Sequence, residues 1–256
     1  MNVVKKSGSA VSRANEMQGA PAVAGRHLAI GLVLSIVFTA VFARLFDFVE
    51  DHGTAVSSFD REISFWMYHH RARYLTQIAT VLAQMGSPPV MVGLGLVSAL
   101  LGVFWRKVRG AAWTMPIAII GAGVIIQGVK LVIKRPRPSF FAPLLHESGF
   151  SFPSGHSLIA IVVYGLLGYF ALHLFKNVAA RLAIRTVTVL LVVAIGVSRV
   201  YVGVHYPTDV LAGWTAGVPW LISCLALHEV LARRWPSSGE PVLSAQGNAV
   251  KTVLRG

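Results

Sequence analysis

Long apolar runs alternate with short polar segments along most of this chain. Each run approaches the ~20 residues that an α-helix needs to cross the hydrocarbon layer of a membrane. The pattern predicts an all-α, polytopic membrane protein with six transmembrane helices. The predicted spans are residues 28–46, 90–105, 111–133, 154–175, 186–202 and 210–232.

The segment between the first two spans has a different pattern. Within residues 47–73, Phe59, Ile63, Trp66 and His70 recur at helical spacing beside charged residues. This spacing predicts an amphipathic helix lying at the membrane interface. An apolar stretch over residues 75–85 then ends at a Gly-Ser-Pro-Pro break, and we expect it to lead helically into the second span.

The ends of the chain are polar. We expect residues 1–27 and 233–256 to be disordered tails flanking one membrane domain over residues 28–232. A signal peptide is not expected, because the first apolar run begins only at Leu28 and no clear cleavage site follows it.

Composition supports a membrane protein and argues against two other classes. The chain is 55% hydrophobic and 13% charged, which is unlike a soluble domain. Its net charge of +13 could suggest a nucleic-acid partner, but the cations form short clusters between apolar runs instead of one basic face. We expect no metal site: the adjacent His69 and His70 would face different directions on a helix, and Cys224 is the only cysteine.

The charge distribution predicts the orientation. Six spans place both tails on one side, and the tails and the two basic loops on that side hold 14 of the 23 Lys and Arg residues. The other side holds seven of the ten acidic residues. The positive-inside rule makes the tails cytoplasmic. The basic loops contain Arg106, Lys107 and Arg109, and Lys176, Arg181 and Arg185.

Three polar clusters then fall together at the outer ends of the spans, where ionisable residues mark a functional site. In the first, Lys130 and Arg137 are seven residues apart, close to two helical turns, and would share a face if the helix reached Arg137. Pro136 and Pro138 predict that the helix ends near there. Whether Lys134 and Arg135 contact a substrate stays open.

The second and third clusters supply an anion cradle and a nucleophile. Pro153-Ser154-Gly155-His156 opens the fourth span, where free N–H groups at a helix start favour an anion. Ser198-Arg199 ends the fifth span, and His205 and Asp209 lie at the start of the sixth. Asp209, four residues from His205, could orient its imidazole and leave the other nitrogen to attack.

Together the clusters resemble the three-part signature of the type-2 phosphatidate phosphatase family, membrane lipid phosphatases related to the vanadium haloperoxidases. Lys130, six residues, then Arg137-Pro138 match the first part. Pro153-Ser154-Gly155-His156 match the second. Ser198-Arg199, five residues, His205, three residues, then Asp209 match the third.

The resemblance implies a role for each residue. His205 would form a phosphohistidine, oriented by Asp209, and His156 would protonate the leaving oxygen. The phosphoryl oxygens would be held by Lys130, Arg137, Ser154, the Gly155 N–H and Arg199. No metal or cofactor is implied, because these cations would neutralise the phosphoryl charge.

We therefore expect a hydrolase in a bacterial inner membrane, acting at the extracytoplasmic face on a lipid phosphate in the bilayer. Undecaprenyl pyrophosphate or a broad range of lipids is favoured, with phosphatidylglycerophosphate and phosphatidate as further candidates. Lipid A phosphatase is an alternative. So is a phospholipid transporter or flippase that uses the same anion site only for binding, although a transporter predicts a site near mid-membrane.

Overall fold

The computed structural model describes residues 29–51, 56–104 and 110–234, and every regular element within them is a helix. The predicted tail over residues 1–27 and the basic loop with Arg106, Lys107 and Arg109 lie outside these ranges. So does the predicted C-terminal tail, except for its first two residues. An N-terminal helix spans Ala29–Asp51. It is followed by α2 (Ser58–His69), α3 (Arg73–Met85), α4 (Pro88–Phe104), α5 (Ala111–Ile133), α6 (Gly155–Leu174), α7 (Val178–Tyr201) and α8 (Pro207–Arg234).

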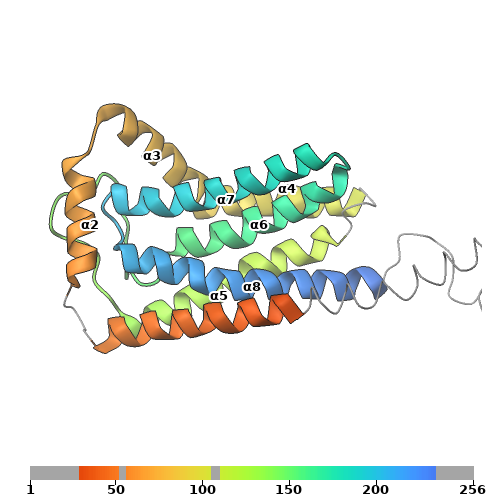
Figure 1. Cartoon of the computed structure of the whole chain (residues 1–256), viewed down its shortest axis with the longest axis horizontal. Helices are drawn as coiled ribbons and strands as arrows, with labels where there is room; N and C mark the ends of the chain where they lie inside the picture. The colour runs from red at the N-terminus through yellow and green to blue at the C-terminus, as the bar shows by residue number, and fades with distance from the viewer. Residues whose placement is uncertain (1–28, 52–55, 105–109, 235–256) are drawn as a thin grey trace, which may run out of the picture.

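The long helices run side by side, and α2 lies across one end of them (Figure 1). The N-terminal helix and α5 to α8 are each long and apolar enough to cross a membrane. Helices α3 and α4 meet this test together, as a pair bent by 50° at a short break. Counting the pair as one span gives six within the described residues, which confirms the predicted multi-pass architecture. The second span is therefore a bent pair, in which α4 corresponds to the span predicted over residues 90–105 and α3 to the helical lead-in expected over residues 75–85.

The fifth predicted span is too short. Helix α7 begins at Val178, so Arg181 and Arg185 lie within it and not in a basic loop. Asn177 begins the helix because its side-chain oxygen accepts a hydrogen bond from the Ala179 N–H, 2.8 Å away. A helix can continue past the apolar layer with polar residues, which a search for apolar runs cannot detect.

The core of the bundle forms where α5, α6 and α8 meet. Leu158, Val162 and Leu166 of α6 are fully buried against Met115 and Ala122 of α5. Large apolar side chains on the outside, such as Leu32, Val124 and Leu190, stay 62–67% exposed, as expected for surfaces that face lipid. Without hydrophobic driving force between helices in lipid, close packing through small residues holds such a bundle together.

Helix α2 turns its polar face toward the bundle. Phe59 and Trp66, on the predicted apolar stripe, are 48% and 57% exposed. Asp60 and Ser64, one helical turn apart, are instead buried against the protein. The prediction of an amphipathic helix holds, and its apolar stripe faces outward, where it can contact the membrane interface.

We expect the contact between α6 and α8 to tolerate no added side chain at Gly213. A Cβ there would lie 2.6 Å from the carbonyl oxygen of Ser154 and 2.8 Å from the Cβ of Ser157. Gly213→Ala should therefore destabilise the protein by about 1–3 kcal/mol, the usual cost of overpacking. Thermal unfolding in detergent measures this.

Gly123→Ala is the matched control, because a Cβ at this position in α5 meets nothing within 4 Å. Alanine favours helix over glycine by roughly 0.8–1 kcal/mol, so this variant should unfold at the same temperature or higher. Equal melting temperatures for the two variants would contradict the close approach of α6 to α8.

Candidate active site

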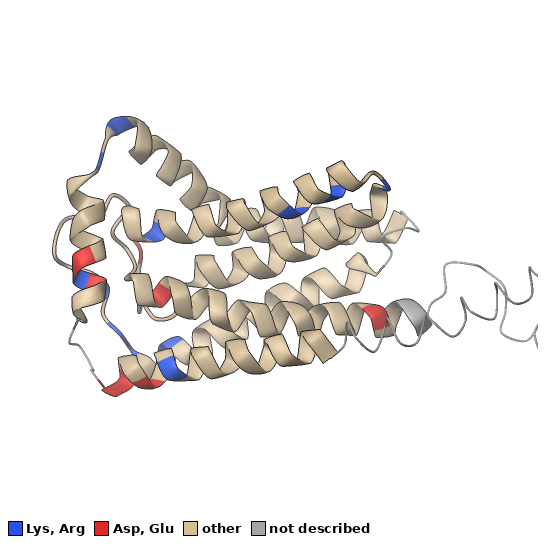
Figure 2. Ribbon diagram, in the orientation of Figure 1, with Lys and Arg blue, Asp and Glu red and all other residues tan. Residues whose placement is uncertain are grey.

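Most charged residues of the bundle gather at its α2 end, with a smaller group toward the opposite end and few in the middle of the helices (Figure 2). The three clusters predicted from sequence meet at this end. Between α5 and α6, residues 134–154 cross the same end without regular helix. This connection brings its own side chains into contact with the starts and ends of four helices.

The first cluster leaves its helix before Arg137. Helix α5 ends at Ile133, and Lys134 follows in the left-handed conformation with φ 49°. The helix therefore does not carry Lys130 and Arg137 on one face. They still lie close enough for their charges to interact, because the connection turns back toward the bundle. Lys134 itself is exposed.

His205 lies between an acid and a cation. Its Nδ1 is 3.4 Å from Asp209 Oδ2, and its Nε2 is 3.2 Å from Arg137 Nη1. Because a guanidinium can only donate, Nε2 must accept, which places the imidazole proton on Nδ1 facing Asp209. Both His205 and Asp209 are buried. The arrangement leaves the imidazole lone pair on Nε2, the nitrogen that faces Arg137.

Arg137 is fixed mainly by backbone oxygens. Its guanidinium donates to the carbonyl oxygens of Ser148, Gly149 and Val204, at 2.9–3.1 Å. The same side chain thus ties the connection between α5 and α6 to the segment just before His205. It can also present N–H groups to an anion at Nε2.

Arg135, whose contact with a substrate the sequence left open, forms ion pairs with two buried acids. Its Nη2 is 2.8 Å from Asp60 Oδ2, and its Nη1 is 2.6 Å from Asp209 Oδ1. Asp60 also accepts bonds from the backbone and the hydroxyl of Thr208, at 2.9 and 2.7 Å. The guanidinium lies 4.2 Å from the centre of the Tyr206 ring. With these bonds to Thr208, Asp209 and Asp60, Arg135 holds Asp209 in place.

Helix α6 starts inside the site. The Ser154 hydroxyl caps it by accepting from the Ser157 N–H at 3.4 Å and from the Ser157 hydroxyl at 2.9 Å. The Ser154 N–H donates to the backbone oxygen of Asp209, 2.9 Å away, which fixes the start of α6 to that of α8. Gly155 and His156 form the first helical turn, and His156 is 9% exposed. Here the helix dipole favours an anion.

Arg199, near the end of α7, is 1% exposed and forms an ion pair with Glu147 at 2.6 Å. Glu147 comes from the connection between α5 and α6 and also lies 4.0 Å from His156 Nε2 and 3.8 Å from Arg137 Nη2. Arg199 Nε has no hydrogen-bond partner among the described residues. The buried Arg199 guanidinium therefore pairs with the Glu147 carboxylate through Nη2, while its Nε–H has no partner among the described residues.

The pKa of His205 is lowered to about 4, mainly by burial and in part by the nearby Arg137 and Arg199, whose combined effect outweighs the opposing influence of Asp209. At neutral pH the imidazole is therefore uncharged and keeps its lone pair. Burial alone would also lower the pKa of Arg135, but Asp209 and Asp60 raise it above the usual value, so this cation stays charged.

Every candidate residue predicted from sequence lies at this end of the bundle. Two residues were missed, Asp60 and Glu147. Asp60 is recognisable in retrospect as an acid on the side of α2 away from its apolar stripe. Glu147 is the single acidic residue between the first and second clusters.

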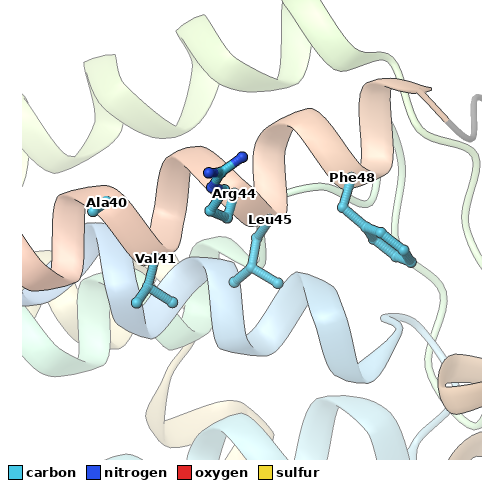
Figure 3. A pocket seen from close by; sticks show the side chains of 5 residues that line it. All are labelled: Ala40, Val41, Arg44, Leu45 and Phe48. Carbon is cyan, nitrogen blue, oxygen red and sulfur yellow. The ribbon is translucent and has the colours of Figure 1, made fainter.

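A shallow surface pocket lies on the N-terminal helix. It is lined by Ala40, Val41, Arg44, Leu45 and Phe48 (Figure 3). None of them belongs to the three clusters.

Comparisons with known proteins agree with the geometry. A model of the PAP2 superfamily matches residues 111–233, which include all three clusters. Phosphatidylglycerophosphatase B of Bacillus subtilis is 35% identical over 169 residues, which are 65% of this chain and 82% of that protein. The chain belongs to the PAP2 superfamily.

Two further comparisons extend the match of this PAP2 protein. The crystal structure of a transmembrane PAP2 type phosphatidylglycerolphosphate phosphatase from Bacillus subtilis superposes with a TM-score of 0.70 at 30% identity, covering 77% of this chain and 96% of that one. The undecaprenyl-diphosphatase of Sulfolobus acidocaldarius is 29% identical over 191 residues, 73% of this chain and 84% of that protein. The PAP2 protein described here is thus a multi-pass membrane phosphatase, a hydrolase, as its sequence resemblance implied.

Asp60→Asn should destabilise this PAP2 protein and slow its turnover. Removing one partner from a buried ion pair costs about 3–5 kcal/mol, because the other charge stays buried. Arg135 would then hold Asp209 less firmly, so kcat should fall while KM changes little. Thermal unfolding and steady-state phosphate release measure the two effects.

The control is Glu62→Gln on the same helix, which removes an equal charge from an exposed position. It should change neither quantity. An Asp60→Asn protein with wild-type stability and kcat would show that the Asp60–Arg135–Asp209 chain does not support the site.

Proposed function

We propose that this protein removes a terminal phosphate from a membrane lipid through a phosphohistidine on His205. One observation carries the proposal: His205 Nε2 is unprotonated and its lone pair points at Arg137, in a buried site that also contains Arg199 and Lys130. A nucleophile oriented by an acid and surrounded by cations suits phosphoryl transfer, which depends on positioning and charge stabilisation.

The proposed reaction has two steps. His205 Nε2 attacks phosphorus, the bond from phosphorus to the lipid oxygen breaks, and His156 gives that oxygen a proton. Water then attacks the phosphohistidine and releases phosphate, with His156 taking up a proton. Arg137, Arg199, Lys130, Ser154 and the Gly155 N–H stabilise the phosphoryl oxygens. These groups supply the charge that a metal ion provides in other phosphatases.

A lipid substrate fits the position of the site. The cations lie at one end of helices that are apolar along their length, so a lipid tail can remain in the bilayer while its phosphate enters (Figure 2). A site at the end of the spans also favours the phosphatase over the transporter alternative, which needs a site at mid-membrane.

Among lipid phosphates we favour a phosphate monoester such as phosphatidylglycerophosphate. The Bacillus subtilis relative and the Bacillus subtilis structure both bear the name of that activity. Undecaprenyl diphosphate, favoured from sequence alone, is the second candidate and is supported by the Sulfolobus relative. Lipid A remains a third substrate for comparison.

The charge pattern supports a bacterial inner membrane location with the site at the extracytoplasmic face. Lys176 precedes α7, and Arg181 and Arg185 lie in its first half, whereas His205 and Asp209 follow its other end. Figure 2 shows cations toward the end of the bundle opposite α2. By the positive-inside rule this basic end is cytoplasmic.

Replacing His205 and replacing His156 should have different effects on the reaction. His205→Ala should abolish both turnover and the trapped phosphoenzyme, because no acceptor remains. His156→Ala should slow phosphoenzyme formation by roughly 10²–10⁴-fold on a lipid phosphate, whose leaving group is an alcohol. It should slow the reaction much less on an activated aryl phosphate, whose leaving oxygen needs little proton assistance. Quenched-flow trapping of acid-labile phosphohistidine measures the rate of phosphoenzyme formation in both variants. The lipid substrates are phosphatidylglycerophosphate, phosphatidate, undecaprenyl diphosphate and lipid A. Excess EDTA is present throughout.

His173→Ala is the matched control, since this exposed histidine lies in the last turn of α6, far along the same helix from His156. It should behave as wild type. Activity that disappears in EDTA and returns with Mg²⁺ would contradict the mechanism, and equal losses on aryl and lipid substrates would remove His156 from the acid role.

Orientation can be tested with single cysteines in a Cys224→Ala background. Ser148→Cys, beside the site, should react with an impermeant thiol reagent in intact cells. Lys176→Cys, in the turn between α6 and α7, should react only after the membrane is opened. The reverse pattern would overturn the proposed orientation.

A further inference from the structure

The carboxylate of Glu147 lies among the groups proposed to bind phosphate. It is 2.6 Å from Arg199 Nη2, 3.8 Å from Arg137 Nη2 and 4.0 Å from His156 Nε2. Two of these residues are proposed to hold phosphoryl oxygens, and the third to protonate the leaving oxygen. An anion at this place lies where the substrate's own charges must go.

Glu147 and a phosphoryl group compete for Arg199. Among the described residues Glu147 is the one carboxylate within ion-pair distance of this cation, which is 1% exposed. Arg199 Nε is buried without a hydrogen-bond partner. A phosphoryl group with two oxygens can engage Nε and Nη2 together, the bidentate geometry that guanidinium favours. A substrate bound in this way would bring its negative charge against the Glu147 carboxylate, which already pairs with Nη2.

The carboxylate cannot move far from this place. The backbone around it is fixed on both sides: the Leu144 N–H donates to the Val202 oxygen at 2.8 Å, and the Ser151 N–H donates to the Arg135 oxygen at 2.8 Å. Arg137 holds the oxygens of Ser148 and Gly149. Only the Glu147 side chain is free to rotate, and 29% of it is exposed. Its negative charge therefore stays beside the site after the phosphate binds.

We propose that Glu147 is a specificity-determining residue that selects lipid phosphate monoesters over lipid diphosphates. The inference rests on the proposed function and narrows its substrate class. Glu147 lies next to His156, on the side where the leaving group departs. A monoester places an uncharged alcohol oxygen there, whereas a diphosphate places a second phosphate. Like charges brought together in a poorly solvated site weaken binding strongly.

The test compares two lipids with one tail, farnesyl monophosphate and farnesyl diphosphate. The diphosphate has the better leaving group, because a phosphate departs from it instead of an alcohol. The informative quantity is therefore the change on mutation in the ratio of kcat/KM for the diphosphate to kcat/KM for the monophosphate, and not the ratio itself. Glu147→Gln should raise the diphosphate-to-monophosphate ratio by about tenfold or more, a size typical of removing one like-charge contact. The same variant should bind vanadate about tenfold more tightly, since the competitor for Arg199 is lost.

Two control variants separate the charge of Glu147 from other effects. Glu147→Asp keeps the charge and should keep the preference for the monoester. Glu62→Gln removes an equal charge from an exposed position on α2 and should leave both the ratio and the vanadate affinity unchanged. Thermal unfolding checks that each variant is folded.

A competition assay keeps this test apart from that of the proposed function. If the wild type hydrolysed neither lipid, the proposed function would fail, but the displacement of vanadate by each lipid would still report the preference. The Glu147 proposal is overturned if Glu147→Gln leaves both the diphosphate-to-monophosphate ratio and the vanadate affinity at wild-type values. A ratio that falls would overturn it as well.

Discussion

The ion pairs of Arg135 with Asp60 and Asp209 link the helices at the site end of this protein. One buried guanidinium, 4% exposed, joins α2 to the first turn of α8. Taking charges out of water is expensive, and such a pair is tolerated only where hydrogen bonds satisfy its remaining atoms. Thr208 does so for Asp60, and the Tyr206 N–H does so for Asp209.

The surroundings of His205 are built on this arrangement. Asp209 contacts His205 Nδ1 through Oδ2, while Arg135 holds its other oxygen, Oδ1. The start of α6 is positioned through the same residue, since the Ser154 N–H donates to the backbone oxygen of Asp209. The proposed anion cradle at the start of α6 and the proposed nucleophile His205 are therefore connected through one aspartate, at the place where α6 and α8 approach without room for a side chain at Gly213.

Cations outnumber acids around the candidate phosphate position, and Glu147 partly offsets them. An empty site lined by Lys130, Arg137 and Arg199 would leave three positive charges with little to balance them. Glu147 supplies an internal anion in contact with two of these cations. The proposed discrimination between leaving groups rests on the same feature, because the carboxylate is attached to a backbone that the site itself holds.

The sequence by itself determined the membrane class, the number of spans and the residues of the three clusters. Apolar length is set by bilayer thickness, and the clusters carry chemistry in residue types at fixed spacing, so both are local and readable. The roles of Asp60, Arg135 and Glu147 were decided only by tertiary structure. Asp60 is 75 residues from Arg135, and Glu147 is 52 from Arg199. Such distant pairs follow from how the helices pack and where the connection between α5 and α6 turns back, and neither is encoded in a local pattern.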